Sequence, residues 1–162
     1  MGRLKFSAPA ALTDCLEAAG ARGFVRRALL WMREAGDSAA VFDDDGLLAV
    51  AFLVPAGDEL EFCLAILPRA RARMRGLVRL AHLTLSRLAE NGAVITCRVR
   101  PGHRPGERMA AMTGFRHVDG DKWIFEGIAS DGTDRQRPVR RRSRQGSQAG
   151  SAEKPRAAGG VE

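Results

Sequence analysis

The chain has little of several residue types on which particular kinds of site depend. Its 162 residues include no tyrosine and three cysteines, Cys15, Cys63 and Cys97, without C-x-x-C spacing. An odd number of cysteines without paired spacing argues against a disulfide framework and against a thiolate metal site. The lack of tyrosine removes the phenol from the available proton donors. We therefore expect small buried thiols in a reducing compartment, no disulfide and no bound metal.

Long apolar runs are also missing. The longest, such as Leu47–Pro55, fall well short of the roughly 20 residues that a membrane-spanning helix needs. The N-terminal residues Met-Gly-Arg-Leu-Lys-Phe have no apolar stretch after their charges, so we expect no signal peptide. These observations predict a cytoplasmic chain without a membrane partner.

Lysine is scarce, with three residues against 23 arginines, and the formal net charge is +7. Residues 131–162 are rich in Gly, Ser, Arg and Gln and have almost no large apolar side chain. Such a segment cannot bury enough surface to offset its ordering entropy. We predict a folded domain over residues 1–130 and a disordered basic tail over 131–162. The block Arg137–Arg144 in this tail either binds nucleic acid or is solvated and binds nothing specific.

The folded part has the alternating pattern of an α/β domain. Apolar periodicity and turn residues predict helices over residues 10–19, 23–35, 70–90 and 106–113, and strands over 3–6, 38–42, 47–54, 59–67, 93–99, 115–118 and 122–125. In the second helix Phe24, Ala28 and Trp31 recur near helical spacing. In the third, a stripe is expected to face the core: Met74, Val78, Ala81, Leu85 and Leu88. Asp43–Asp45 lacks the alternating ligand spacing of a calcium loop, so we expect a solvated hairpin turn.

Arginine is concentrated in Arg69–Arg79, where eleven residues contain five arginines and no acid. This stretch follows a predicted strand and Pro68 and opens the long helix. The start of a helix offers unpaired N–H groups and a positive dipole end, which suit phosphate. Three interpretations stay open: a cofactor-phosphate site, a surface for nucleic acid or an anionic partner, and a solvated helix face.

The order strand, basic loop, long helix, strand, short helix and Gly114-Phe115 resembles the GNAT acyltransferase superfamily over roughly residues 41–127. Arg73-Met-Arg-Gly76-Leu-Val78 is similar to its Arg/Gln-x-x-Gly-x-Gly/Ala pyrophosphate loop, with Val78 in place of the final small residue. The resemblance implies a mixed, mostly antiparallel sheet with flanking helices, and acetyl-CoA as co-substrate. The cofactor-binding residues it implies are Leu67, Arg71, Arg73, Met74, Arg75, Gly76, Leu77 and Val78.

The resemblance also implies direct attack of an amine on the thioester, with a base acting on the amine. Glu59 and Glu61 alternate on a predicted strand and so share one face, where they are either bases in a cleft or exposed carboxylates. His103, before the short helix, is a third candidate, although a histidine in such a loop is more often exposed or caps the helix. The family's usual tyrosine acid aligns with Ala110. We therefore expect an N-acyltransferase that uses another proton donor or releases the thiolate unaided.

The same layout is similar to the GNAT-like internal virion proteins of short-tailed phages. Those proteins also carry a basic segment in place of a clean pyrophosphate loop. This resemblance implies the alternative function: a non-catalytic structural or accessory protein, associated with a virion, that contacts nucleic acid or an assembly through the basic surface and tail.

Overall fold

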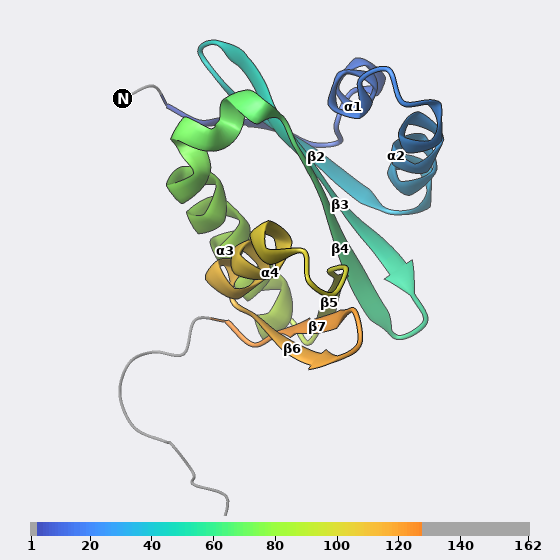
Figure 1. The fold of residues 1–162 in the computed structure, drawn as a ribbon, viewed down its shortest axis with the longest axis vertical. Coiled ribbons are helices and arrows are strands. Elements are labelled where there is room, and N and C mark those ends of the chain that lie inside the picture. Colours follow the sequence, from blue (N-terminus) through green and yellow to red (C-terminus); the bar gives the residue numbers. More distant parts are fainter. Residues whose placement is uncertain (1–2, 128–162) are drawn as a thin grey trace, which may run out of the picture. The chain divides into compact units, whose positions relative to one another are not determined.

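The computed structural model describes residues 3–127 of the chain. The predicted tail, including Arg137–Arg144, lies outside the described residues. The described elements, in chain order, are β1 (Lys5–Ser7), α1 (Leu12–Ala19), α2 (Gly23–Ala35), β2 (Asp37–Asp43), β3 (Gly46–Ala56), β4 (Glu59–Ile66), the 3-10 helix η1 (Pro68–Arg73), α3 (Met74–Glu90), β5 (Val94–Arg98), α4 (Arg104–Thr113), β6 (Phe115–Asp119) and β7 (Lys122–Phe125). The strands form one sheet of order β1-β2-β3-β4-β5-β7-β6 (Figure 1).

The sheet is mixed, because β4 and β5 run parallel while each of the other neighbouring pairs is antiparallel. The long connection between the two parallel strands carries η1 and α3. The predicted α/β fold, with a mostly antiparallel sheet and flanking helices, is confirmed. The long helix differs in its start: residues 70–73 belong to η1, in which the Ala70 N–H donates to the Leu67 carbonyl at 3.0 Å.

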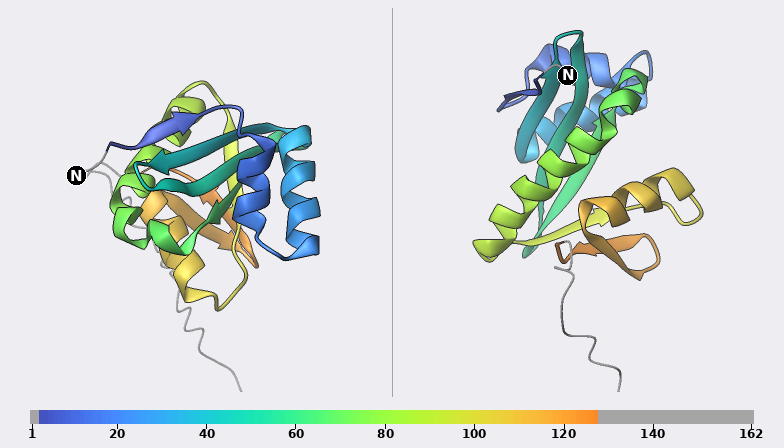
Figure 2. Two further views of the ribbon diagram at one scale, coloured as in Figure 1. Left: turned by 90° about the horizontal axis from the view of Figure 1, so that it is seen from above. Right: turned by 90° about the vertical axis from the view of Figure 1, so that its left-hand side faces the viewer.

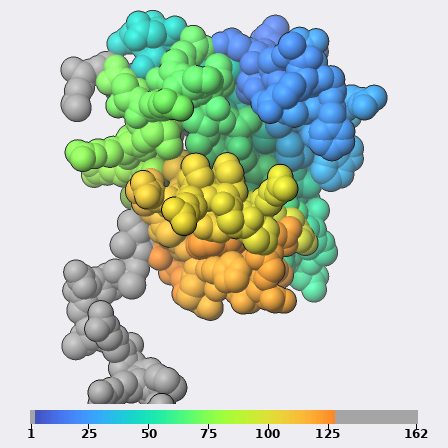
Figure 3. Space-filling view, viewed as in Figure 1, coloured from blue at the N-terminus to red at the C-terminus, as the bar shows by residue number. Residues whose placement is uncertain are grey.

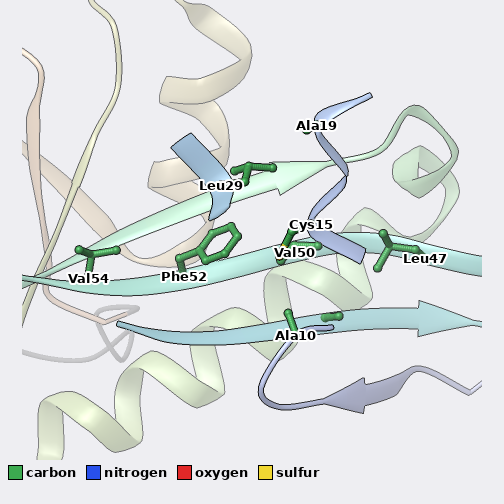
Figure 4. Close-up of a cluster of buried hydrophobic side chains, with 9 residues drawn as sticks. Ala10, Cys15, Ala19, Leu29, Leu47, Val50, Phe52 and Val54 are labelled. Atoms are coloured by element: carbon green, nitrogen blue, oxygen red, sulfur yellow. The ribbon is translucent and has the colours of Figure 1, made fainter. Parts of the chain in front are cut away.

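Helices cover both faces of the sheet (Figure 2). On one face, α1 and α2 pack against alternate residues of β3, and Figure 4 shows Val50 and Phe52 on the same side of the strand as Cys15 and Leu29. On the opposite face, α3 packs through Leu77. The period-two alternation of strand side chains gives each helix layer its own apolar surface.

The buried side chains of α2 and α3 are not simply the residues whose spacing indicated the helices. In α2, Leu29 is buried while Phe24 and Trp31 are 78% and 61% exposed, because α2 rests on the sheet through a neighbouring face of the helix. In α3 the buried residues are Leu85, which was expected, and Leu77, which was not. The remaining members of the predicted α3 stripe are half-buried. Within residues 3–127, no helix is both long enough and apolar enough to cross a membrane.

Candidate active site

The parallel strands β4 and β5 separate after a short paired stretch. Their pairing ends at Glu61 and Thr96, whereas β4 continues to Ile66 with a partner only in β3. Beyond Thr96, β5 pairs with β7 on its other side. A gap therefore opens between the two strands, and one edge of β4 faces this gap with backbone groups that no strand pairs.

A cavity of about 560 Å³ occupies this gap, and we call it the cleft. Its walls come from β4, β5, the loop after β5, α4 and Met74 at the start of α3. Figure 3 shows two of these parts on the surface, with the green N-terminal part of α3 above the yellow start of α4. The volume falls in the usual range for small-molecule sites, about 300–1,000 Å³.

Glu61 is the carboxylate that lines the cleft. Its side chain is 28% exposed, and one carboxylate oxygen lies 3.8 Å from the Arg98 Nε. The same guanidinium donates to Asp121 Oδ1 at 2.9 Å, so Arg98 is shared between two carboxylates. The other Glu61 oxygen lies 4.0 Å from the Cys63 Sγ. Glu61 is therefore held at the cleft wall without a close, exclusive cation partner.

Glu59 has different surroundings, although it lies on the same face of β4. Lys122 Nζ is 2.8 Å from one carboxylate oxygen, and the Thr96 hydroxyl donates to the other at 3.4 Å. The hydrogen bond from Lys122 and its charge hold the pKa of Glu59 below its ordinary value. Glu59 is not among the residues that line the cleft. Sequence alternation alone does not distinguish Glu59 from Glu61, but the structure places only Glu61 in the cleft wall and pairs Glu59 with Lys122.

His103 also lines the cleft, at the position just before α4. It is exposed, and its ring packs over Gly106. A Cβ added at Gly106 would lie 2.5 Å from the His103 Nδ1 and 2.9 Å from a Val99 methyl group. Gly106 therefore leaves the space that the imidazole occupies at the mouth of the cleft. Ala110, at the position of the family's tyrosine, is buried and lines the cleft as well.

Two thiols line the cleft, a placement that sequence reasoning missed. Burial raises the pKa of Cys63 to about 11 and the pKa of Cys97 to about 12. Both thiols are therefore neutral near pH 7 and are poor nucleophiles. The expectation of buried thiols is confirmed for Cys15 and Cys97, whereas Cys63 is half-buried. Their strand positions were the only sequence signal, because the approach of β4 to β5 depends on tertiary pairing.

Two arginines of the basic stretch brace the turn between β2 and β3. Arg69 donates to the Leu47 carbonyl and to Glu17. Arg73 Nε lies 3.1 Å from an oxygen of Asp43, whose side chain is only 5% exposed. Burial of Asp43 is the largest single effect on its pKa and acts to raise it. The hydrogen bonds from the Asp45 N–H and from Arg73, with the nearby arginine charges, together outweigh burial and hold the pKa below its ordinary value. Asp43 is thus a buried, ion-paired carboxylate, and the expected fully solvated turn is corrected at this residue.

The other three arginines of the stretch, Arg71, Arg75 and Arg79, are exposed and form no ion pair with another described residue. Their spacing of four places them along one face, as the sequence indicates. Arg75 and Gly76 lie in the first turn of α3, which continues directly from η1 through a hydrogen bond from the Met74 N–H to the Arg71 carbonyl.

Of the residues predicted to hold the cofactor, Met74 lines the cleft directly. Leu67 donates its N–H to the Leu48 carbonyl, Leu77 is buried in the core and Val78 is half-buried. A Cβ on Gly76 would lie 3.1 Å from a Leu4 methyl group, so the missing side chain of Gly76 gives Leu4 room beside α3.

The arrangement is similar to that of solved acetyltransferases. The ribosomal-protein-S18-alanine N-acetyltransferase of Escherichia coli aligns over 75% of this chain and 90% of its own, with 16% identity and a TM-score of 0.56. A Bacillus subtilis acetyltransferase in complex with CoA aligns over 76% and 95%, with 15% identity and a TM-score of 0.52. A GNAT family acetyltransferase of Elizabethkingia anophelis with acetyl-CoA bound aligns over 72% and 78%, with 14% identity and a TM-score of 0.55.

No family model matches the sequence, and no curated protein matches it. The likeness is therefore one of structure, at 14–16% sequence identity and TM-scores of 0.52–0.56. On the strength of its strand order and its structural neighbours, the chain has the GNAT acetyltransferase fold.

Proposed function

We propose that the chain is an acyl-CoA-dependent N-acyltransferase that uses the cleft between β4 and β5. The observation that carries the proposal is the separation of these strands at Glu61, which leaves an unpaired β4 edge beside a cavity of about 560 Å³. An extended ligand rich in amide groups can pair with such an edge through main-chain hydrogen bonds. The pantetheine arm of CoA has this chemistry, and two of the similar structures contain CoA or acetyl-CoA.

The phosphate end of the ligand is assigned to the start of α3. The N–H groups of Arg75 and Gly76 lie in its first turn, and Met74 joins this turn to the cleft. Helix N-termini favour anions, and the exposed Arg71 and Arg75 add positive charge that no other described residue neutralises. Arg73 is assigned a structural role, because it is already paired with Asp43.

Glu61 is the proposed general base. It accepts a proton from the amine as the nitrogen attacks the thioester carbonyl; the C–N bond forms, the C–S bond breaks and the thiolate leaves. A thiol with an ordinary pKa of about 8.5 is a competent leaving group, so release without a tyrosine acid is chemically reasonable. His103 is the histidine that lines the cleft, and it is the proposed donor of a proton to that thiolate.

The matched pair Glu61→Gln and Glu59→Gln tests this assignment. With acetyl-CoA and a primary amine that is turned over, Glu61→Gln should lower kcat by roughly 10²–10⁴-fold, the usual contribution of a positioned base. Glu59→Gln should leave kcat within a few-fold, because Glu59 is bound to Lys122 outside the cleft. Equal losses in the two variants would remove Glu61 from the role of base.

A second candidate function is a non-catalytic GNAT-like protein of an assembly. It is favoured by Ala110 at the tyrosine position and by the engagement of Arg73 with Asp43. In that case Arg71, Arg75 and Arg79 would form an anion-binding surface. The two functions are distinguished by turnover: sustained CoA release that depends on an added amine and on Glu61 argues for the enzyme. Its absence across a broad amine panel, together with salt-sensitive binding to DNA, argues for the assembly protein.

A further inference from the structure

A second space lies on the α3 side of the sheet, and we call it the apolar chamber. Its volume is about 250 Å³, and its walls include Ala39, Ala49, Ala51, Leu77 and Ala81. Apart from Asp37, Ser38 and Thr84, every residue that lines it is apolar. The chamber is open to solvent on one side, where the exposed residues Phe6, Asp37 and Thr84 line it. Exposed apolar surfaces of this kind often mark binding sites.

The register of the strands accounts for the chamber. Ala39 of β2 pairs with Ala51 of β3, and Ala51 pairs with Leu64 of β4. Two short side chains therefore stand next to each other on the sheet, under Leu77 and Ala81 of α3. Methyl groups at these positions are too short to fill the distance between the sheet and the helix.

The chamber adjoins the cleft. Phe62 and Leu64 of β4 line both spaces and form the partition between them. The Phe62 ring is half-buried and stacks on Phe115, with 6.0 Å between ring centroids. If a thioester lies in the cleft along β4, only the side chains of Phe62 and Leu64 separate its acyl end from the apolar chamber.

We propose that the apolar chamber receives the hydrocarbon chain of the acyl donor, so that the enzyme prefers medium-chain acyl groups to acetyl. This inference rests on the proposed function and specifies its donor. In the donor complex the chain passes between Phe62 and Leu64, while the thioester stays in the cleft. The reaction is unchanged: R–CO–S–CoA and an amine give the amide R–CO–NH–R′ and CoA–SH. The amine proton goes to Glu61 and on to solvent, and the leaving thiolate takes a proton from His103.

The volume sets the expected chain length. An engineered apolar cavity of about 150 Å³ stays dry and binds benzene, so a chamber of about 250 Å³ accommodates roughly six to ten carbon atoms. The nearly complete absence of polar lining excludes a ligand group that needs hydrogen bonds at this end. The octanoyl group is the best single probe.

The test measures Kd by calorimetry for acetyl-, butyryl- and octanoyl-CoA, with wild type, Ala51→Leu and Ala111→Leu. Ala51 lines the chamber, whereas Ala111 is exposed on α4 and lines neither space. Burial of one methylene corresponds to about a fourfold change in affinity, so wild type should bind octanoyl-CoA at least tenfold more tightly than acetyl-CoA. Ala51→Leu should abolish this preference and keep acetyl-CoA binding, and Ala111→Leu should retain both. Ala39→Leu, on the neighbouring strand, replaces Ala51→Leu if that variant does not fold.

The possible failures are distinguishable. Equal affinity for acetyl- and octanoyl-CoA in wild type overturns the chamber proposal and leaves the proposed function standing. Failure to bind any acyl-CoA overturns both. A wild-type dimer that Ala51→Leu converts to a monomer, without any effect of chain length, overturns the proposal in favour of a second copy as the occupant of the chamber.

Discussion

Ala39 and Ala40 are neighbours on β2, yet the same substitution should change stability in opposite directions at the two positions. Ala39 lines the apolar chamber, whereas Ala40 has no exposed surface and lies in the packed cluster under α1 and α2. Replacing each alanine with valine adds the same two methyl-sized groups and changes strand propensity equally. The difference in outcome therefore reports the space available on the two faces of the sheet.

The magnitude follows from the packing. Two added carbons in the chamber gain about 1.6 kcal/mol, at about 0.8 kcal/mol for each buried CH₂. In the packed cluster, the same atoms force strain that typically costs about 1–3 kcal/mol. For a domain of this size, 1 kcal/mol moves Tm by about 3–5 °C. We expect Ala39→Val to raise Tm by roughly 5–8 °C and Ala40→Val to lower it by a similar amount or more.

The assay is thermal unfolding followed by circular dichroism, with urea denaturation at 25 °C to obtain the free energy of unfolding. Ala39→Val and Ala40→Val should be compared in the same buffer without acyl-CoA, because a ligand in the chamber would itself stabilise the wild type. A decrease in Tm of similar size for both variants would show that the α3 side is as closely packed as the other. That result would refute the chamber and the donor preference inferred from it.

Two further predictions concern ionisable groups. The folded-state pKa of Glu59 is lowered, chiefly by the hydrogen bond from Lys122, so its stabilisation is present above the unfolded value of about 4.5 and is lost as pH falls through the folded value. The Tm gap between wild type and Glu59→Gln should therefore shrink from pH 6 to pH 3, and a constant gap would contradict this. Because the pKa of Cys63 is raised to about 11 and that of Cys97 to about 12, each of these thiols in the folded protein at pH 8 should react with iodoacetamide at least about 100-fold more slowly than a free thiol. Rapid alkylation of either thiol in the folded chain would contradict the burial that raises these values.

Much of the fold could be predicted because its signals are local. The turn at Asp43–Gly46, the glycine after α3 and the Gly114-Phe115 junction all mark element boundaries within a few residues of those observed. The alternation of Glu59 and Glu61 correctly predicts that they share one strand face. Periodicity and turn chemistry require only neighbouring residues, so a single sequence contains them.

The features that decide function depend on residues far apart in the chain. Lys122 neutralises Glu59 across 63 positions, and Arg73 pairs with Asp43 across 30. Of the five arginines, Arg69 and Arg73 bond to residues around the β2–β3 turn, whereas the other three are exposed without an ion pair to another described residue. Their spacing in the sequence does not reveal this difference. The apolar chamber likewise depends on strand register, which brings Ala39 beside Ala51.

The exposed face of α2 was also beyond prediction from the sequence. Phe24 and Trp31 have the spacing of a buried stripe, but the neighbouring face through Leu29 contacts the sheet. A helix with apolar residues on more than one face can dock in more than one orientation, and the choice is made by packing against β2 and β3.

Binding of acetyl-CoA to the cleft is the central claim, and calorimetric titration of the full chain with acetyl-CoA tests it most directly. We expect saturable one-to-one binding that Arg75→Glu abolishes, because a carboxylate on this exposed position in the first turn of α3 would repel the phosphates. Ala111→Leu, exposed on α4 outside the cleft, should bind as wild type does. Absence of binding at millimolar acetyl-CoA, or binding that Arg75→Glu leaves unchanged, would contradict the assignment of the cleft and of the α3 N-terminus as the acyl-CoA site.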